Sequence, residues 1–239
     1  MSVRNLDALF APRAIALLGA SNGASSIGAV LARNLLESGF KGPILPVHAG
    51  ERSIRSMMTY AAVEDLPIVP DLAVIASPAE DVPRAIDALG ARGCRAAVVI
   101  SAGFEASGLG GLALRQAMLD AAKPHTLRIV GPDCLGLLSP AAGLNASYAH
   151  CAPRPGNIAF LTQSGLIATS VLDWADARGI GFSHIVSLGE MSDVDFGDLL
   201  DVLESDAKTR VILLYVESIT EARKFLSAAR IAARSKPVV

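Results

Sequence analysis

The segment AIALLGASNGASSIG, residues 14–28, decides the fold. Residues 14–18 are a short apolar run that predicts a buried strand, and residues 19–23 form a turn of small residues. The pattern after the turn predicts an amphipathic helix from about Ser26 to Ser38. A strand, a glycine-containing turn and a helix in this order make the first half of a βαβ unit. The segment therefore predicts an α/β fold.

The same alternation continues along the chain and predicts a parallel sheet. The polar stretch 51–67 predicts a loop with a short element. Ala, Val, Ile and Leu dominate the apolar content and aromatic residues make up only 5%, as is typical of sheets buried on both faces by helices. Apolar runs predict further strands at 43–47, 71–76, 96–100, 127–130 and 137–138, and periodic segments predict helices at 82–92 and 112–122.

A break at residues 149–156 divides the chain. The sequence HCAPRPG at 150–156 carries two prolines and a glycine, which marks a domain boundary between residues 1–148 and 157–239. Strands are expected after it at 158–161, 184–187 and 211–216, and helices at 166–178, 196–203 and 221–234. The last residues, 236–239, resemble the opening of another strand, so we expect a natural protein that continues and a second domain that is truncated here.

The bulk composition narrows the classes of partner. The 239 residues carry a net charge of −2 and are 51% hydrophobic, which predicts a compact domain pair with no general attraction to nucleic acid or to an anionic membrane. No apolar run is long enough to span a bilayer. The three cysteines show neither a paired framework nor metal-ligand spacing, so we expect a cytoplasmic protein without a metal site. The oligomeric state stays open.

Small or polar loops follow the predicted strands of the first domain, where ligands of open parallel sheets bind. Each loop alone is equally well explained as an ordinary turn, but their combination favours a ligand. The first precedes a helix, whose N-terminal N–H groups favour a phosphate. The loops are GAS at 19–21, ASP at 76–78, SAG at 101–103 and GPDC at 131–134.

The spacing of glycines disfavours a nicotinamide dinucleotide as that ligand. The fingerprint G-x-G-x-x-G requires closer glycines than Gly19, Gly23 and Gly28, and no carboxylate ends the second strand to hold a ribose. Arg52 and Arg55 follow that strand, where the 3′-phosphate of coenzyme A would favour cations; each alone is as well explained as a solvated loop charge.

A set of short motifs runs through nearly the whole chain in a fixed order: GAS at 19–21, ISAGF at 100–104, GPDCLG at 131–136, NIAFLTQSG at 157–165 and SLG at 187–189. Together they resemble ADP-forming (NDP-forming) acyl-CoA synthetases, which are similar to the α subunit of succinyl-CoA synthetase. The resemblance implies a Rossmann-like CoA-binding domain followed by a flavodoxin-like, succinyl-CoA-ligase-like domain with a parallel sheet.

The resemblance also implies roles for the first-domain loops. They would hold CoA or acyl-CoA, with Cys134 near the thiol end; a small buried apolar residue is the commoner fate of a lone cysteine, and we assign Cys134 no nucleophilic role. The implied cofactor-binding residues are Gly19, Ala20, Ser21, Ser77, Pro78, Ser101, Ala102, Gly103, Asp133 and Cys134.

In the second domain, Ser164 and Gly165 lie between a predicted strand and a helix. N–H groups at this helix start can hold a phosphoryl group, with the Ser164 hydroxyl as a further donor, and Ser164 can equally act as an N-cap. The resemblance implies that Glu217 orients the phosphorylated histidine of the family. A carboxylate that accepts from one imidazole N–H leaves the other nitrogen free to attack phosphorus.

The family converts acyl-CoA, ADP and phosphate into acid, CoA and ATP through that phosphohistidine. Its position lies beyond Val239, so the resemblance implies that this chain binds CoA but needs further segments: the histidine, and an ATP-grasp domain or subunit for ATP, ADP and Mg²⁺. By the resemblance the whole protein is an acetate–CoA ligase type of enzyme, and this segment alone is inactive.

Some positions depart from the family. Asp133 and Glu190 stand where asparagine is usual, which adds negative charge near a polyanionic ligand. An alternative is therefore an acyl-CoA-sensing, synthetase-like module of a GNAT-type protein lysine acetyltransferase. The acidic residues between 190 and 201 lack calcium-loop spacing, and we expect them to serve the start of a helix instead.

Overall fold

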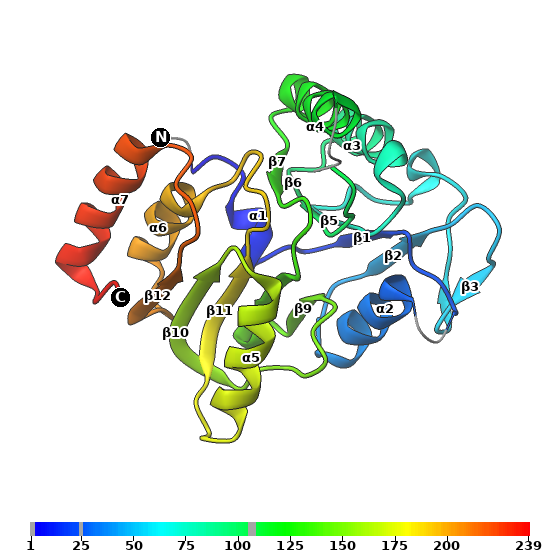
Figure 1. Ribbon diagram of the computed structural model, residues 1–239. Coiled ribbons are helices and arrows are strands. Elements are labelled where there is room, and N and C mark those ends of the chain that lie inside the picture. Colours follow the sequence, from blue (N-terminus) through cyan, green and yellow to red (C-terminus); the bar gives the residue numbers. More distant parts are fainter. Residues whose placement is uncertain (1–2, 24–25, 105–108) are drawn as a thin grey trace.

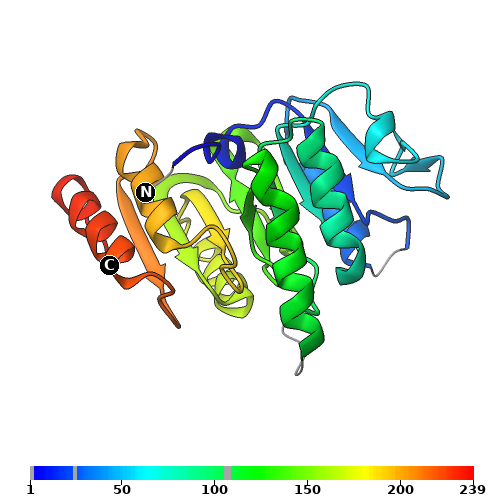
Figure 2. The same cartoon turned by 90° about the horizontal axis from the view of Figure 1, so that it is seen from above.

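In the computed structural model, which describes residues 3–23, 26–104 and 109–239, strands and helices alternate and form two neighbouring sheets (Figure 1). The predicted pair of α/β domains is confirmed. Each sheet lies between layers of helices. Seen from above, the helices of the two domains lie side by side (Figure 2). Along the described residues, every helix falls short of the length and hydropathy needed to cross a membrane.

The first sheet has the strand order β2-β1-β5-β6-β7, and all its strands are parallel. The chain winds outward from β1 to β2 and then returns to the other side of β1, so the carboxyl ends of β1 and β5 form the topological switch point where such sheets bind ligands. The bounds are β1 Ile15–Leu18, β2 Ile44–Val47, β5 Leu72–Ile75, β6 Ala96–Val99 and β7 Arg128–Val130.

Helices cover both faces of this sheet. Leu17 belongs to one core cluster with Leu31 of α2, whereas the neighbouring Leu18 belongs to another with Ile86 of α3. Successive residues of a strand point to opposite faces, so the inner strands of this sheet, at 15–18, 72–75 and 96–99, are apolar at every position. The helices are α1 Asp7–Phe10, α2 Ile27–Glu37, α3 Val82–Ala91 and α4 Leu109–Ala122; a small hairpin joins β3 Ser53–Ile54 to β4 Met57–Met58, and 3₁₀ turns lie at Val63–Asp65, Ala79–Asp81, Lys123–His125 and Pro140–Ala142.

The second sheet has the order β12-β10-β11-β8-β9. Its β10, β11 and β12 are parallel, as expected, but β8 and β9 are antiparallel and attach through β8 to β11. These two strands fall within residues 1–148, so the predicted first segment contributes to the second sheet; the limits of the domains stay a prediction. The bounds are β8 Gly136–Ser139, β9 Leu144–Ser147, β10 Pro155–Thr162, β11 Phe182–Ser187 and β12 Val211–Tyr215.

Helix α5 (Gly165–Asp176) covers one face of the second sheet, and α6 (Phe196–Ser205) with α7 (Ala222–Ser235) covers the other. Phe160 of β10 packs with Leu172 of α5, and the next residue, Leu161, packs in the cluster that contains Leu199 of α6. After α7 the chain runs beside β12, where the Ile212 N–H donates to the Pro237 carbonyl at 2.9 Å and the Leu214 N–H to the Val239 carbonyl at 2.8 Å. Residues 236–239, expected to open a strand, thus end in an isolated parallel bridge between Val238 and Ile212.

A backbone ladder joins the two domains. The N–H groups of Glu190, Ser192 and Val194 donate to the carbonyls of Pro132, Gly131 and Ile129 at 3.0–3.1 Å. Gly189 has a φ of +55°, and a Cβ there would lie 2.2 Å from the Pro132 carbonyl oxygen, so only glycine permits this approach. The loop after β11 is therefore fixed against the loop after β7.

Ion pairs next to the backbone ladder also hold the two domains together. Arg128 contacts Asp193 and Asp198, each at 3.0 Å, and Lys224 contacts Asp198 at 2.7 Å. Asp195 caps α6 by accepting from the Asp198 N–H at 3.0 Å, while Asp198 accepts in return from the Asp195 N–H. Asp195 and Asp198 thus lie at the helix start as expected, whereas Asp193 lies before it and pairs with Arg128.

Asp71 ties three strands together at the opposite, amino edge of the first sheet. Its carboxylate accepts from the Arg13 backbone N–H at 2.8 Å, from the Arg13 guanidinium and from the Arg95 guanidinium, both at 3.1 Å. Asp71 and Arg95 directly precede β5 and β6, and Arg13 lies two residues before β1. Burial by itself would raise the pKa of Asp71, but the hydrogen bonds from Arg13 and Arg95 lower it to about 2.

We predict that Asp71 makes the fold acid-sensitive. Its pKa in the folded chain is about 2 against an ordinary 3.8, so it stabilises the fold above about pH 4 and this contribution is lost as the pH falls toward 2. The loss amounts to roughly 2 kcal/mol. Urea unfolding of Asp71→Asn should show lower stability at pH 7 and a flatter dependence on pH between 4 and 2. Asp81→Asn, which removes an exposed carboxylate 3.7 Å from Arg84, should match the wild type; equal pH profiles for the wild type and Asp71→Asn would contradict the assignment.

Candidate functional site

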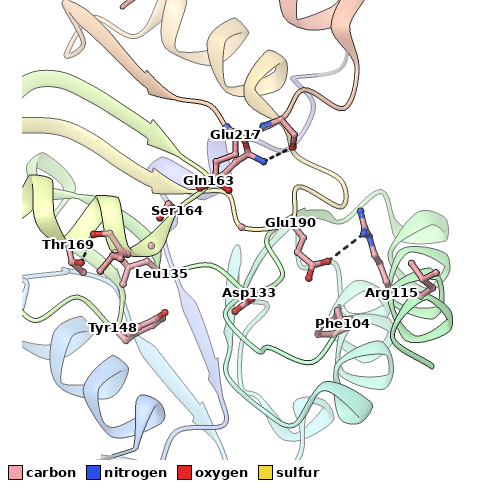
Figure 3. Close-up of a pocket in the computed structure, with 15 residues that line it drawn as sticks. Phe104, Arg115, Asp133, Leu135, Tyr148, Gln163, Ser164, Thr169, Glu190 and Glu217 are labelled. Atoms are coloured by element: carbon pink, nitrogen blue, oxygen red, sulfur yellow. Dashed lines mark hydrogen bonds and ion pairs between the residues drawn. The ribbon is translucent and has the colours of Figure 1, made fainter. Parts of the chain in front are cut away.

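The carboxyl ends of strands from both sheets open into one cavity of about 1000 Å³ (Figure 3). Phe104 and Asp133 follow β6 and β7 of the first sheet, and Ser164, Glu190 and Glu217 follow β10, β11 and β12 of the second. Ligands of α/β proteins bind at this edge of a sheet. The ladder between the domains thus brings two such edges to a shared site.

The predicted first-domain loops lie next to each other at that edge. Gly19 has a φ of +78°, and a Cβ there would lie 2.4 Å from the Ala76 carbonyl carbon, so the β1 and β5 loops touch through their backbones. The Ser101 hydroxyl donates to the Ser77 carbonyl at 2.5 Å, and the Asp133 N–H donates to the Ser101 carbonyl at 3.1 Å. The loops after β1, β5, β6 and β7 therefore form one continuous rim.

A second cavity of about 380 Å³ lies along the first part of this rim. Gly19 and Ser77 line it together with His48 at the end of β2, and Arg84 of α3 supplies a guanidinium. Ser21 lies just beyond, hydrogen bonded at 2.5 Å to the hydroxyl of Ser26, the N-cap of α2. The rim thus offers one small space near the switch point and one large space near the second domain.

The residues predicted to bind CoA differ in their solvent exposure. Pro78, Ala102, Gly103 and Asp133 are exposed, whereas Ala20 is buried. Asp133 has a φ of +53°, a left-handed conformation that Asp and Asn tolerate. It lines the larger cavity, and its carboxylate faces the open space in Figure 3.

Cys134 points away from the rim. Its side chain is 2% exposed and donates to the Val99 carbonyl at 3.3 Å, and burial raises the pKa of the thiol to about 12. The side chain fills the core beneath the loop, in line with the commoner fate of a lone cysteine. Any contact of Cys134 with a ligand would have to come from its backbone.

Ser164 begins α5 as an N-cap, accepting from the Ile167 N–H at 3.3 Å. Buried Thr162 fixes the turn before it, because its hydroxyl accepts from the Ser164 N–H at 3.0 Å. The first N–H groups of any α-helix have no partner within the helix and carry a partial positive charge. Ser164 and Gly165 line the large cavity, so this helix start is available to an anion there.

Gln163 holds the Glu217 loop beside the helix start, a contact that sequence reasoning did not assign. Its Oε1 accepts from the N–H groups of Glu217 and Ser218 at 2.7 and 2.8 Å, and its Nε2 donates to the Ser218 hydroxyl at 3.0 Å. Glu217 is exposed and lines the cavity. The structure thereby places Ser164, Gly165 and Glu217 around one space, on two neighbouring strands.

The cavity wall is acidic. Asp133, Glu190 and Glu217 line it, and Arg115 of α4 approaches Glu190 at 3.5 Å (Figure 3). Tyr148 adds a phenol whose pKa is raised chiefly by burial and further by the Asp133 carboxylate. Phe104 ends the ISAGF motif but had no assigned role at the sequence level, and nothing in the local pattern distinguishes Arg115 and Tyr148 from surface or core residues.

Family models match both domains. A model described as a CoA binding domain matches residues 13–140, more than half of the chain. A second, described as a succinyl-CoA ligase like flavodoxin domain, matches residues 155–239. The two matches follow the order expected from the sequence motifs.

Known relatives agree with these models. ADP-forming acetate–CoA ligase I of Archaeoglobus fulgidus is 38% identical over 98% of this chain, which spans 34% of that protein. The α subunit of ADP-forming acetate–CoA ligase I of Pyrococcus furiosus is 35% identical over 98% of this chain, which spans 52% of the subunit. The apo structure of the dinucleotide forming acetyl-coenzyme A synthetase 1 of Ca. Korarchaeum cryptofilum superposes with a TM-score of 0.92 at 36% identity, over 98% of this chain and 51% of that one. The chain thus spans about half or less of these proteins.

We predict that Gln163→Ala loosens the Glu217 loop without unfolding the domain. The substitution removes both hydrogen bonds to the loop N–H groups, each worth about 1 kcal/mol, so amide exchange at residues 217 and 218 should accelerate roughly tenfold or more. Hydrogen–deuterium exchange with mass spectrometry measures this directly.

Gln116→Ala is the matched control, because Gln116 is exposed and its side-chain amide donates to Asp120 on its own helix at 2.9 Å. Exchange at residues 217 and 218 should stay at the wild-type rate in this variant. Unchanged exchange in Gln163→Ala would show that Gln163 does not hold the loop.

Proposed function

The chain belongs to the CoA binding domain family and continues into a succinyl-CoA ligase like flavodoxin domain, and from this we propose that it is the CoA-binding portion of an ADP-forming acyl-CoA ligase. The observation that carries the proposal is the shared cavity, where the rim of the first domain meets the helix start of the second. Such a ligase must bring a CoA thiol and a phosphorylated or acylated group together, and the cavity joins a loop rim to an anion-binding helix start.

We assign CoA to the rim along the carboxyl edge of the first sheet. The nucleotide end would lie in the smaller cavity beside Gly19, His48 and Ser77, with Arg84 near its phosphates. The pantetheine arm would follow the β6 and β7 loops, past Ser101 and Asp133, into the large cavity. Backbone groups of small residues allow such a chain to pass closely, which accounts for the residue types at Ala20, Pro78, Ala102 and Gly103.

In the second domain, the start of α5 would hold the phosphoryl group. The N–H groups after Ser164 and at Gly165 supply fixed donors that do not reorganise during reaction. Glu217, held by Gln163 beside this site, would accept from the imidazole N–H of a histidine supplied by another part of the full protein. Nucleotide and Mg²⁺ binding would fall to an ATP-grasp partner. We place the protein in the cytoplasm, in keeping with its unpaired cysteines.

The relatives favour the ligase over the acyl-CoA-sensing acetyltransferase module. They are ADP-forming acetate–CoA ligases that match across 98% of this chain, through both domains. The names of these relatives give acetate as the acid. For the full protein we propose only that the acyl substrate is a carboxylic acid.

We predict that the purified chain binds CoA and not NAD. Isothermal titration should give one CoA site with a Kd in the micromolar to low millimolar range, and no heat from NAD at equal concentration, since the rim has neither dinucleotide glycine spacing nor a ribose-binding carboxylate after β2. Binding of NAD without CoA would overturn the assignment of this domain.

We also predict that Asp133→Asn tightens CoA binding. The substitution removes negative charge beside a polyanion, keeps the size of the side chain and is compatible with the φ of +53°. A unit charge in a wet cleft contributes about 1 kcal/mol at contact range, so the Kd should fall about threefold to fivefold. Asp120→Asn, on the same domain but outside the cavity lining, should leave the Kd unchanged. A weaker or equal Kd for Asp133→Asn would exclude Asp133 from the CoA path.

A further inference from the structure

A cluster of different donor groups lies away from the large cavity, where the connection between β9 and β10 crosses α5. His150 and Cys151 lie on the connection and Asp173 on the helix. Their ligand atoms, a ring nitrogen, a thiol sulfur and a carboxylate oxygen, all lie within 4.8 Å of one another. The His150 Nε2 and Asp173 Oδ1 atoms are 2.5 Å apart. No metal-ligand spacing reveals this cluster in the sequence, because the third donor is separated from the other two by a strand and half a helix.

We propose that His150, Cys151 and Asp173 form a zinc site with three protein ligands. Nitrogen, sulfur and oxygen donors together suit borderline-soft Zn²⁺, whereas Mg²⁺ and Ca²⁺ require oxygen ligands. Zinc binds sulfur at about 2.3 Å and nitrogen or oxygen at about 2.0 Å, so tetrahedral donors lie roughly 3.3–3.6 Å apart. The present spacing needs adjustments of about an ångström, which exposed side chains at His150 and Asp173 can make by rotation.

The surroundings favour a cation at this place. Asp173 carries a carboxylate next to the Cys151 thiol, whereas the neighbouring Asp176 is paired with Arg154 at 3.1 Å, so Asp173 is the anion that is left to a bound cation. A cavity of about 400 Å³ borders His150 and Cys151 on the side of α2, with Glu37 and Asn145 on its wall. This space leaves room for water as the fourth ligand.

Zinc at this site would fasten the interdomain connection to α5. Asp173 lies on the helix whose first residues, beginning at Ser164, line the large cavity. The buried Asn34 side chain already holds the preceding segment by donating to the carbonyls of Ser147 and Ala149, both at 2.8 Å. A metal ion would extend this attachment across to the second domain. The ion would therefore have a structural role, as a cross-link between the connection and α5. The proposal does not depend on the ligase assignment.

The test is titration of the intact chain with Zn²⁺ and, separately, Mg²⁺ in a buffer that does not chelate metals. Zn²⁺ should bind one to one, and Mg²⁺ should not bind. Cys151→Ser, His150→Ala and Asp173→Asn should each weaken zinc binding by roughly a hundredfold, since loss of even an outer partner of a ligand costs about 10- to 100-fold. His125→Ala is the matched control, because it removes a histidine–aspartate pair, His125 and Asp87 at 3.1 Å, outside this cluster.

Protection of the thiol gives a second readout that does not depend on affinity. Cys94 and Cys134 are 1% and 2% exposed, so native alkylation should modify Cys151 first, and Zn²⁺ but not Mg²⁺ should slow that reaction. Circular dichroism confirms that each variant is folded. Zinc binding that is absent, or equal in the wild type and all three ligand variants, would overturn the proposal, as would alkylation of Cys151 at the same rate with and without zinc.

Discussion

The backbone ladder between residues 129–132 and 190–194 is the contact on which the candidate site depends. It fixes the loop after β11 of the second sheet against the loop after β7 of the first, and Gly189 makes the approach possible because a side chain would collide with the Pro132 carbonyl. Without this contact each sheet would present its own carboxyl edge separately. With it, the two edges line one space, and Phe104 and Glu217, more than a hundred positions apart, face the same cavity.

Acidic side chains line both cavities. At the smaller one, near the switch point of the first sheet, Glu64 and Asp81 accompany Arg84 and small residues such as Gly19 and Ser77. In the larger cavity, carboxylates of Asp133, Glu190 and Glu217 outnumber the Arg115 guanidinium among the described lining residues, and fixed N–H groups at the start of α5 supply positive potential. A polyanion entering the larger cavity is therefore guided by the helix start and repelled elsewhere, which restricts where phosphate can be placed.

Much of the fold follows from local pattern. The alternation of apolar runs and periodic segments predicts nearly all the central strands and long helices, and the small residues at 19–21, 101–103 and 131–134 identify the ligand-binding edge because only such residues allow backbones to touch there. Ser164 as an N-cap is likewise a local property. The pairing of β8 with β11 was not predictable, since a short apolar strand has no signal that selects its sheet.

Long-range contacts set the remaining limits of prediction. In the sequence, Gln163 is only one position of the NIAFLTQSG motif. The tertiary structure is needed to show that its side-chain amide holds the Glu217 loop. Cys134 lies in a ligand-binding motif, yet its side chain turns into the core, because loop direction is set by the positive φ of Asp133 and by packing under β6. The donors at His150, Cys151 and Asp173 converge only because β10 and α5 fold back on the connection.

We propose above all that CoA lies along the rim of the first domain, from the smaller cavity into the large cavity that both domains line. A crystal structure of the chain soaked with CoA tests it most directly. We expect density that starts at the tips of β1 and β5 and ends with the thiol in the large cavity, between Asp133 and the start of α5. Ordered CoA elsewhere on the surface, or a nucleotide at the tips whose pantetheine arm turns away from the second domain, would contradict it.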